Sequence, residues 1–274
     1  MNLLSVAAPI VFALFTVGPG PAGSKVPAPA VSSPSTAASP SLALALAQVL
    51  ARVDELHKRR DDQVAFAEER ALVQGALARA PQDYGVLWRA ARVSFWQSDD
   101  PGQGNDERSR VGKDGWDLAE RAVAVNPNRV EGQYWAAVCM GNYALGLGVV
   151  KALANGMEGK FRERLGRAEQ LDRGYEFGAI DTAWGRFYDK LPWPKRDRQE
   201  AGRRFHKAVE VNASNLRARV YLASSYLDEN RAADAKHLLD EVAAAVPGRY
   251  DAPEERRAKA VGAGLMPLVV AKLR

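Results

Sequence analysis

The sequence has 274 residues, enough for a substantial buried core, and its formal net charge at pH 7 is +5. Isoleucine and threonine are nearly absent, whereas alanine, leucine, arginine and glutamate dominate; this composition favours helices and excludes a strand-rich fold. Most of the basic excess is arginine interleaved with acidic residues, as in Glu254-Glu255-Arg256-Arg257, a pattern typical of solvated helix faces. No nucleic-acid-reading motif accompanies the charge, so we expect no nucleic-acid partner.

The N-terminal part of the chain differs from the rest. Residues 3–17 form an uncharged apolar run that is too short for a stable membrane span, and Pro9 interrupts it. The run suits the apolar region of a secretory signal, although no Lys or Arg precedes it. We therefore interpret residues 1–22 as a signal peptide and expect a periplasmic or otherwise exported protein, the alternative being a cytoplasmic one. Residues 23–40, rich in Pro, Ala and Ser, are predicted to be a disordered linker, and residues 41–274 the folded domain.

A helical repeat is clearest between residues 216 and 247. Apolar residues recur at helical spacing on both sides of the turn Asp228-Glu229-Asn230, and Asn230 tolerates the left-handed backbone of such a turn. Pro247 is expected to end the second helix. Residues at the large, small and aromatic positions resemble the tetratricopeptide (TPR) pattern: Leu222, Ala223, Tyr226, Ala235, Leu239, Val242 and Pro247. The resemblance predicts an all-α, TPR-like α-α superhelix of stacked helical hairpins.

Similar helix endings recur upstream and extend the array. Their predicted partner helices lie at 84–96, 130–143 and 177–188. We expect about four hairpins, preceded by a helix at 41–60 and closed by a capping C-terminal helix at 252–273.

Polar residues indicate where helices start and where a loop is inserted. Side chains of Asp83, Asn128 and Asn215 are predicted to cap the helices that follow them, and Asp251-Ala-Pro-Glu254 has the form of a capping box. The stretch from Ser98 to Asp114 is rich in Gly, Asp and Ser and is predicted to be an inserted loop.

One part of the array has a closer resemblance. It rests on Tyr134-Trp135 running into Gly141-Asn-Tyr143, on the turn at 171–175, and on the Trp- and Pro-containing stretch at 184–194. With these segments, residues 130–245 resemble the TatT-like T components associated with TRAP transporters. The resemblance implies a helical, periplasmic, non-enzymatic protein that assists ligand uptake by contacting an extracytoplasmic substrate-binding protein. The chain departs from the family in lacking a lipid-bearing cysteine directly after the signal, because its only cysteine is Cys139.

No pattern of catalytic or ligating residues emerges from the sequence. The run Gly146-Leu-Gly148-Val-Val-Lys151 lacks the ending of a phosphate loop, and Cys139 has no evident base partner. We expect a buried, inert thiol and no catalytic, cofactor or metal site. The glycines at 141, 146, 148, 156 and 159 are interpreted as points of close helix packing or kinks. The three histidines are too far apart in sequence to indicate a metal site: His57, His206 and His237.

The binding candidates are aromatic and polar residues. Trp193 lies between two prolines, where it is hard to bury, and is predicted to be an exposed anchor. Arg186 follows the small position of its helix and is predicted to face the concave groove, the alternative being a structural salt bridge. Asn142, Tyr143 and Arg217 are further groove candidates. Four other tryptophans are expected in the core: Trp88, Trp116, Trp135 and Trp184.

These observations lead to two functional hypotheses. The first is an exported helical-repeat protein in a TRAP-associated role, which binds a substrate-binding protein or a small apolar ligand. The alternative is a general TPR scaffold that docks a peptide or protein partner and is unrelated to transport. A homo-oligomer is compatible with both hypotheses.

Overall fold

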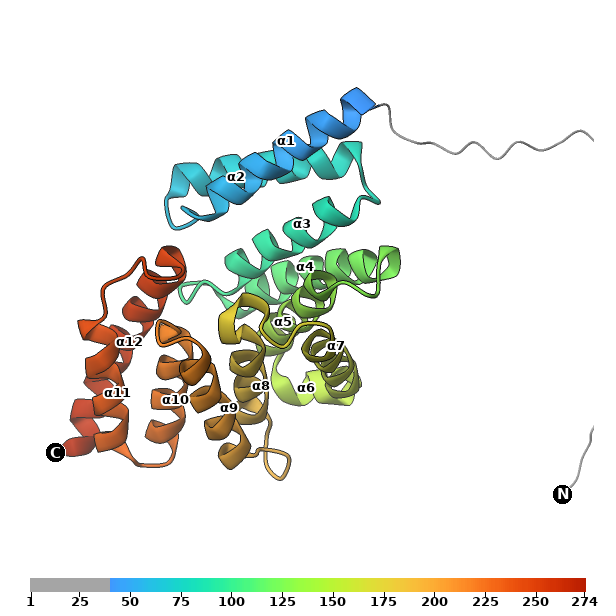
Figure 1. The fold of residues 1–274 in the computed structure, drawn as a ribbon. Helices are drawn as coiled ribbons and strands as arrows, with labels where there is room; N and C mark the ends of the chain where they lie inside the picture. Colours follow the sequence, from blue (N-terminus) through green and yellow to red (C-terminus); the bar gives the residue numbers. More distant parts are fainter. Residues whose placement is uncertain (1–39) are drawn as a thin grey trace, which may run out of the picture. The chain divides into compact units, whose positions relative to one another are not determined.

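The structure is a computed structural model that describes residues 40–274, so the predicted signal peptide and all but the last residue of the predicted linker lie outside it. The described residues form twelve α-helices and one 3-10 helix, with no strand among them, which confirms the all-α prediction (Figure 1). The elements are α1 (Pro40–His57), α2 (Gln63–Arg79), α3 (Tyr84–Ser98), α4 (Asn105–Val125), α5 (Val130–Leu147), α6 (Val149–Ala154), α7 (Met157–Leu171), η1 (Tyr175–Gly178), α8 (Ala179–Lys190), α9 (Arg198–Val211), α10 (Leu216–Asp228), α11 (Ala232–Ala244) and α12 (Ala252–Leu273).

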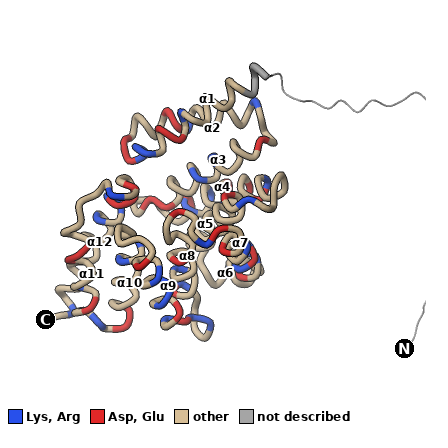
Figure 2. Tube along the Cα trace, in the orientation of Figure 1, with Lys and Arg blue, Asp and Glu red and all other residues tan. Residues whose placement is uncertain are grey.

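The helices of residues 40–274 pack as successive hairpins. The pairs are α1 with α2, α3 with α4, α5 with α7, α8 with α9, and α10 with α11, while α12 lies against both helices of the last pair. The predicted helix at 41–60 is therefore not solitary, because α2 pairs with it in an additional hairpin. Acidic and basic residues are interspersed along these helices (Figure 2). No helix in this part of the chain is both long and apolar enough to cross a membrane.

The hairpin predicted between 216 and 247 is formed by α10 and α11. Ala223 and Ala235 are fully buried there, as small residues at the crossing of two helices should be. Asn230 adopts the left-handed conformation, with φ of 59°, which confirms the predicted turn. One detail differs: α11 ends at Ala244 and its C-cap is Ala245, so Pro247 lies two residues beyond the cap.

Two of the three predicted single-residue caps are confirmed. Asp83 accepts a hydrogen bond from the backbone N–H of the third residue after it, and Asn215 does the same. The prediction for Asn128 is wrong, because α5 has Arg129 at its N-cap and no side-chain cap. The side-chain oxygen of Asn128 instead accepts a hydrogen bond from Arg167 at 2.8 Å.

The loop predicted from Ser98 to Asp114 is mostly helix, and the prediction is wrong for its second part. Helix α4 begins at Asn105, which leaves only residues 99–104 between it and α3. On the exposed side of this helix, Arg110 pairs with Glu107 one turn before it and with Asp114 one turn after it. Such pairs stabilise a polar helix whose composition resembles that of a loop.

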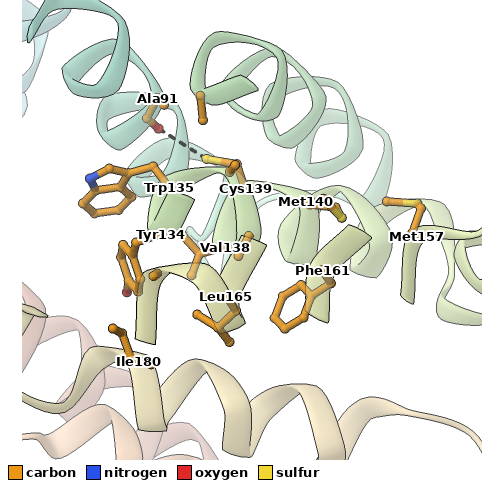
Figure 3. Packing of buried hydrophobic residues seen from close by; sticks show 14 of the residues in the cluster. Ala91, Tyr134, Trp135, Val138, Cys139, Met140, Met157, Phe161, Leu165 and Ile180 are labelled. Carbon is orange, nitrogen blue, oxygen red and sulfur yellow. Dashed lines mark hydrogen bonds between the residues drawn. The ribbon is translucent and has the colours of Figure 1, made fainter. Parts of the chain in front are cut away.

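The largest group of buried side chains surrounds α5. Figure 3 shows Trp135, Cys139 and Met140 on α5, with Cys139 between the other two, and Phe161 and Ile180 contributed by α7 and α8. Cys139 is fully buried and donates a hydrogen bond to a backbone oxygen of α3, and burial raises the pKa of its thiol well above the usual range. The prediction that Cys139 is buried is confirmed.

The tryptophans differ in how far they are buried. Trp135 and Trp184 are buried, as predicted, and Trp88 and Trp116 pack against the same core while remaining partly exposed. Trp193 is 89% exposed, in agreement with the prediction that it lies on the surface.

Glycines between α4 and α7 act in two of the predicted ways. A Cβ atom on Gly146 would lie 2.5 Å from the backbone nitrogen of Ser109, so close packing of α4 on α5 requires glycine there. Gly148 and Gly156 have φ of 93° and 71°, and these left-handed residues end α5 and α6. Gly159 has open space around it and shows neither role.

Candidate functional site

The first helices of the later hairpins surround a cavity of about 260 Å³. Helices α3, α5, α8 and α10 each contribute residues to its wall, and α6, α7 and the start of α12 add to it. Three of the five predicted binding residues line this cavity: Asn142, Arg186 and Arg217.

One end of the cavity is apolar. It is formed where α5 breaks at Gly148 and the chain turns through α6 into α7, opposite the inner face of α8. The rings of Phe161 and Phe187 stack there, with centroids 4.6 Å apart and an interplanar angle of 6°. The other apolar residues at this end are Leu145, Val149, Leu153, Met157 and Leu191. This part of the wall is mostly apolar and favours an apolar ligand. Three charged lining residues are adjacent to it in sequence: Glu158, Arg186 and Lys190.

Another part of the cavity wall, here called the polar end, is lined by Arg60, Asp99, Arg217, Asp251 and Glu254. Within it, Arg217 forms ion pairs with two carboxylates. Its Nη1 is 2.7 Å from Asp99 Oδ2, and its Nη2 donates to Glu254 Oε2 at 2.6 Å. Burial opposes ionisation of both partners, but the opposite charges outweigh it: the pKa of Glu254 is lowered and that of Arg217 is raised. Arg217 therefore links α10 to α3 and α12, a structural task that leaves it little capacity for a ligand.

Contacts of α12 close this end of the cavity. Arg60, just after α1, donates to Asp251 at 2.6 Å although the two are 191 residues apart. The guanidinium groups of Arg60 and Arg257 lie 4.4 and 3.2 Å from the ring centroid of buried Trp96. The beginning and the end of the described array therefore meet here, and charged groups fix their contact.

A buried His–Glu pair lies behind the polar end. Glu69 is fully buried on α2, and its Oε1 is 2.8 Å from Nδ1 of His57, which lines the cavity. Burial raises the pKa of Glu69 to about 7 in spite of nearby Arg92. Burial also lowers the pKa of His57 well below its usual value, with further lowering by Arg92 and Arg60. Both pKa shifts favour the neutral forms of Glu69 and His57.

Replacement of Glu69 by glutamine should change how stability depends on pH. Burial raises the pKa of this carboxyl from 4.5 to about 7, so the folded protein keeps a proton that the unfolded chain releases in that window. The stability that the carboxyl contributes is therefore present below pH 4.5 and is lost as pH rises through 7. We expect Glu69→Gln to gain on the order of 2 kcal/mol relative to the native chain as pH rises across this window, measured by urea unfolding at several pH values.

The matched control for this variant is Glu55→Gln on α1. Glu55 has an exposed side chain that pairs only with Lys58 on the same surface. The free energy of unfolding of Glu55→Gln, relative to the native chain, should stay level over the same pH range. A level difference for Glu69→Gln as well would contradict the raised pKa of Glu69.

Arg186 was predicted either to face the groove or to form a structural salt bridge, and it does both. Its guanidinium lies 4.3 Å from the ring centroid of Tyr221, and its Nη1 is 3.6 Å from Oδ2 of Asp189. Asp189 is buried and is also 3.0 Å from Nζ of Lys190, which lines the cavity with Arg186. Arg186 therefore faces the cavity and has a weak structural ion pair at the same time.

Of the other three candidate binding residues, one lines the cavity and two lie outside it. Asn142 lines the cavity, but its amide donates to Ser98 Oγ at 3.0 Å and so joins α5 to α3. Tyr143 lies outside the cavity wall and packs against Trp116, with ring centroids 6.0 Å apart. Trp193 also lies outside it, in the loop between α8 and α9.

Several cavity residues were not singled out from the sequence. Inward-facing α8 residues recur at the spacing of one helix face, and this spacing marks Phe187 and Lys190 together with Arg186. Leu153, Met157 and Phe161 share a four-residue spacing in the same way. The polar end had no such signal, since its residues come from helices far apart in the chain. Among the described residues, no three His, Cys, Asp or Glu side chains form a cluster that would hold a metal ion.

Known proteins are similar to parts of this chain. Residues 49–177, less than half of the chain, match a family model described as regulator of microtubule dynamics protein 1-3. No curated protein matches the chain. The chain is similar to the crystal structure of a thermophilic TPR protein of Thermus thermophilus, TTC0263, with a TM-score of 0.60 and 16% identity over 81% of this chain and 99% of that one. It also matches the crystal structure of MamA, with a TM-score of 0.42 and 13% identity over 74% of this chain and 95% of that one. The described array is a TPR-like helical-repeat fold.

Proposed function

We propose that this chain is a non-enzymatic binding protein whose cavity takes up a small, mostly apolar ligand. The observation that carries the proposal is the set of apolar residues that α5, α6, α7 and α8 contribute to the cavity wall. A binding site of this kind typically combines apolar lining with a few polar groups that orient the ligand, and Arg186 and Lys190 on α8 provide such groups.

The proposal includes a protein partner at the loop that follows α8. Trp193 is 89% exposed, and an exposed tryptophan is a common anchor in protein interfaces. Leu191, two residues earlier, is buried and lines the apolar end of the cavity. A partner that covers Trp193 would therefore lie close to the ligand. We propose an exported substrate-binding protein of a TRAP transporter as this partner, on the strength of the resemblance over residues 130–245.

A general scaffold that docks a peptide or protein is the second candidate. It is favoured by the family model over residues 49–177, whose description names a regulator of microtubule dynamics and no transporter. Cell fractionation with N-terminal sequencing of the mature protein separates the two candidates. An exported protein whose first residues have been removed supports the transport-associated function, whereas a cytoplasmic protein that keeps them supports the scaffold.

Filling the cavity should abolish uptake of a neutral apolar probe. Ala183 is a partly buried residue of α8 that faces the cavity, so tryptophan at this position occupies the space a ligand would need. We expect Ala183→Trp to weaken binding of N-phenyl-1-naphthylamine by at least about tenfold, measured by fluorescence titration.

The control for this experiment adds the same side chain outside the cavity. Ala233 is exposed on α11, and Ala233→Trp should bind the probe as the native chain does. Circular dichroism should show unchanged helix content in both variants. Equal probe affinity in Ala183→Trp and the native chain would refute ligand uptake by this cavity.

A further inference from the structure

We infer that Arg186 and Lys190 bind the carboxylate of an amphiphilic ligand whose apolar body lies against Phe161 and Phe187. This inference rests on the proposed ligand uptake and names the chemistry of the ligand. Lys, Arg, Asp and Glu side chains from several helices come together in the cavity wall.

Three of the five Lys and Arg residues in the wall are matched by carboxylates at short distance. Arg60 bonds to Asp251 at 2.6 Å and Arg217 to Glu254 at 2.6 Å. Arg92 bonds at 2.9 Å to an aspartate of α1. Arg60 and Arg217 therefore have little charge left for a ligand, while Arg92 shares its aspartate, Asp54, with Arg89 of the same helix.

Arg186 and Lys190 are matched less completely. They share a single carboxylate, that of Asp189, at 3.6 and 3.0 Å. The Nε atom of Arg186 is buried and has no hydrogen-bond acceptor among the described residues, as is also true of Nε in Arg60 and Arg92. Neither oxygen of Asp189 accepts a hydrogen bond there, so its pairing with Arg186 and Lys190 is loose. Two cations beside one carboxylate leave one positive charge and an unused N–H donor at this point of the wall.

Three further carboxylates line the wall. Glu255 accepts hydrogen bonds from the backbone N–H groups of Gly248 and Tyr250, and the other two have partners as well. Glu158 bonds to Arg162 and Lys195 on the outer side of α7 and the loop after α8. Glu176 accepts a hydrogen bond from the hydroxyl of Tyr250 at 2.8 Å. Neither has a hydrogen bond or ion pair with Arg186 or Lys190 among the described residues, so an added anion would complete the pairing there.

The position of Arg186 suits a carboxylate in particular. Its guanidinium is held above the ring of Tyr221, 4.3 Å from the centroid, and a guanidinium positioned by an aromatic ring presents a planar fork that matches two carboxylate oxygens. A single excess positive charge fits a monoanion, whereas a dianionic phosphate would bring one unmatched negative charge into the cavity.

The apolar body of the ligand has its own surface next to this charge. Phe187 follows Arg186 in α8 and stacks on Phe161 at 4.6 Å, and both rings line the cavity. Lys190 comes three residues after Phe187 on the same helix and lines the cavity as well. Head-group charge and apolar wall thus lie on one helix, a turn or less apart, as an alkyl or aryl carboxylate requires.

The test compares two probes of equal chain length, decanoate and decanol, each displacing N-phenyl-1-naphthylamine. We expect the native chain to bind decanoate at least about tenfold more tightly than decanol. Arg186→Gln and Lys190→Gln should each weaken decanoate binding by about tenfold and leave decanol binding unchanged. Asp189→Asn, which removes the competing carboxylate, should strengthen decanoate binding severalfold.

Arg203→Gln is the control, because Arg203 is an exposed arginine of α9 that pairs with Glu200 outside the cavity. It should leave the affinity for both probes unchanged. Equal affinity of the native chain for decanoate and decanol, or unchanged decanoate binding in Arg186→Gln, would overturn the inference while leaving apolar uptake intact. If the naphthylamine dye and decanol also fail to bind, the proposed uptake itself is wrong.

Discussion

Replacement of Ala223 by tryptophan should destabilise the protein more than any other single change considered above. Ala223 is fully buried in the core that α10 shares with α11 and α12, and its neighbours there include Val220 and Leu239. An indole at this point cannot fit unless the helices separate, so we expect a loss of about 3 kcal/mol or more in the free energy of unfolding. For a domain of this size that corresponds to a fall of roughly 10 °C in Tm, measured by circular dichroism.

The same side chain on the outer surface provides the comparison. Ala233→Trp, at an exposed position of α11, should change Tm by no more than about a degree or two, since no neighbouring side chain has to move to accommodate the ring. A native Tm for Ala223→Trp would mean that α10 and α11 do not pack through Ala223, and the assignment of this hairpin would fail with it.

The fold class and the last hairpin could be predicted because their signals are local. A stripe of apolar residues repeats every three or four positions in each helix, and the left-handed Asn230 marks the turn between them. Small residues such as Ala223 and Ala235 then show which faces meet. These features need only the neighbouring sequence to act, so the sequence alone reveals them.

Helix boundaries in polar stretches were harder to predict. The first part of α4 carries so many charged residues that it resembles a loop, yet its glycine-lined face packs closely against α5, and exposed ion pairs such as those of Arg110 add to the helix. Asn128 has the right residue type for a cap, yet Arg167 from α7 takes its side-chain oxygen. Tertiary contacts, which the local sequence does not show, determine both the start of α4 and the partner of Asn128.

The cavity was predictable only in part. Arg186 follows Gly185, whose helix face lies against Phe205, and so turns toward the groove. Asn142 and Tyr143 were both named, but successive residues of a helix point about 100° apart, and only Asn142 faces the cavity. The polar end depends on partners such as Arg60 and Asp251, which are 191 residues apart, and no sequence periodicity relates them.

Alanine at Gly146 should also destabilise the protein strongly, for a different reason. A Cβ atom there would lie 2.5 Å from the backbone nitrogen of Ser109 and 2.6 Å from the backbone oxygen of Asn105. Gly112, on α4, is equally close to the backbone of Tyr143 on α5, so each helix offers a glycine to the other. Because backbone atoms cannot turn aside as side chains do, we expect Gly146→Ala to lose about 3 kcal/mol in the free energy of unfolding, measured with urea.

A glycine that has open space around it separates this effect from helix propensity. Gly75 lies within α2, and a Cβ atom there would meet no other atom within 4 Å. Gly75→Ala should therefore stabilise the protein by about 0.5–1 kcal/mol, the usual preference of a helix for alanine over glycine. The two variants carry the same change and should differ in sign. If Gly146→Ala is also stabilising, α4 and α5 do not approach through their backbones, and the wall of the cavity that α5 forms would have to be placed differently.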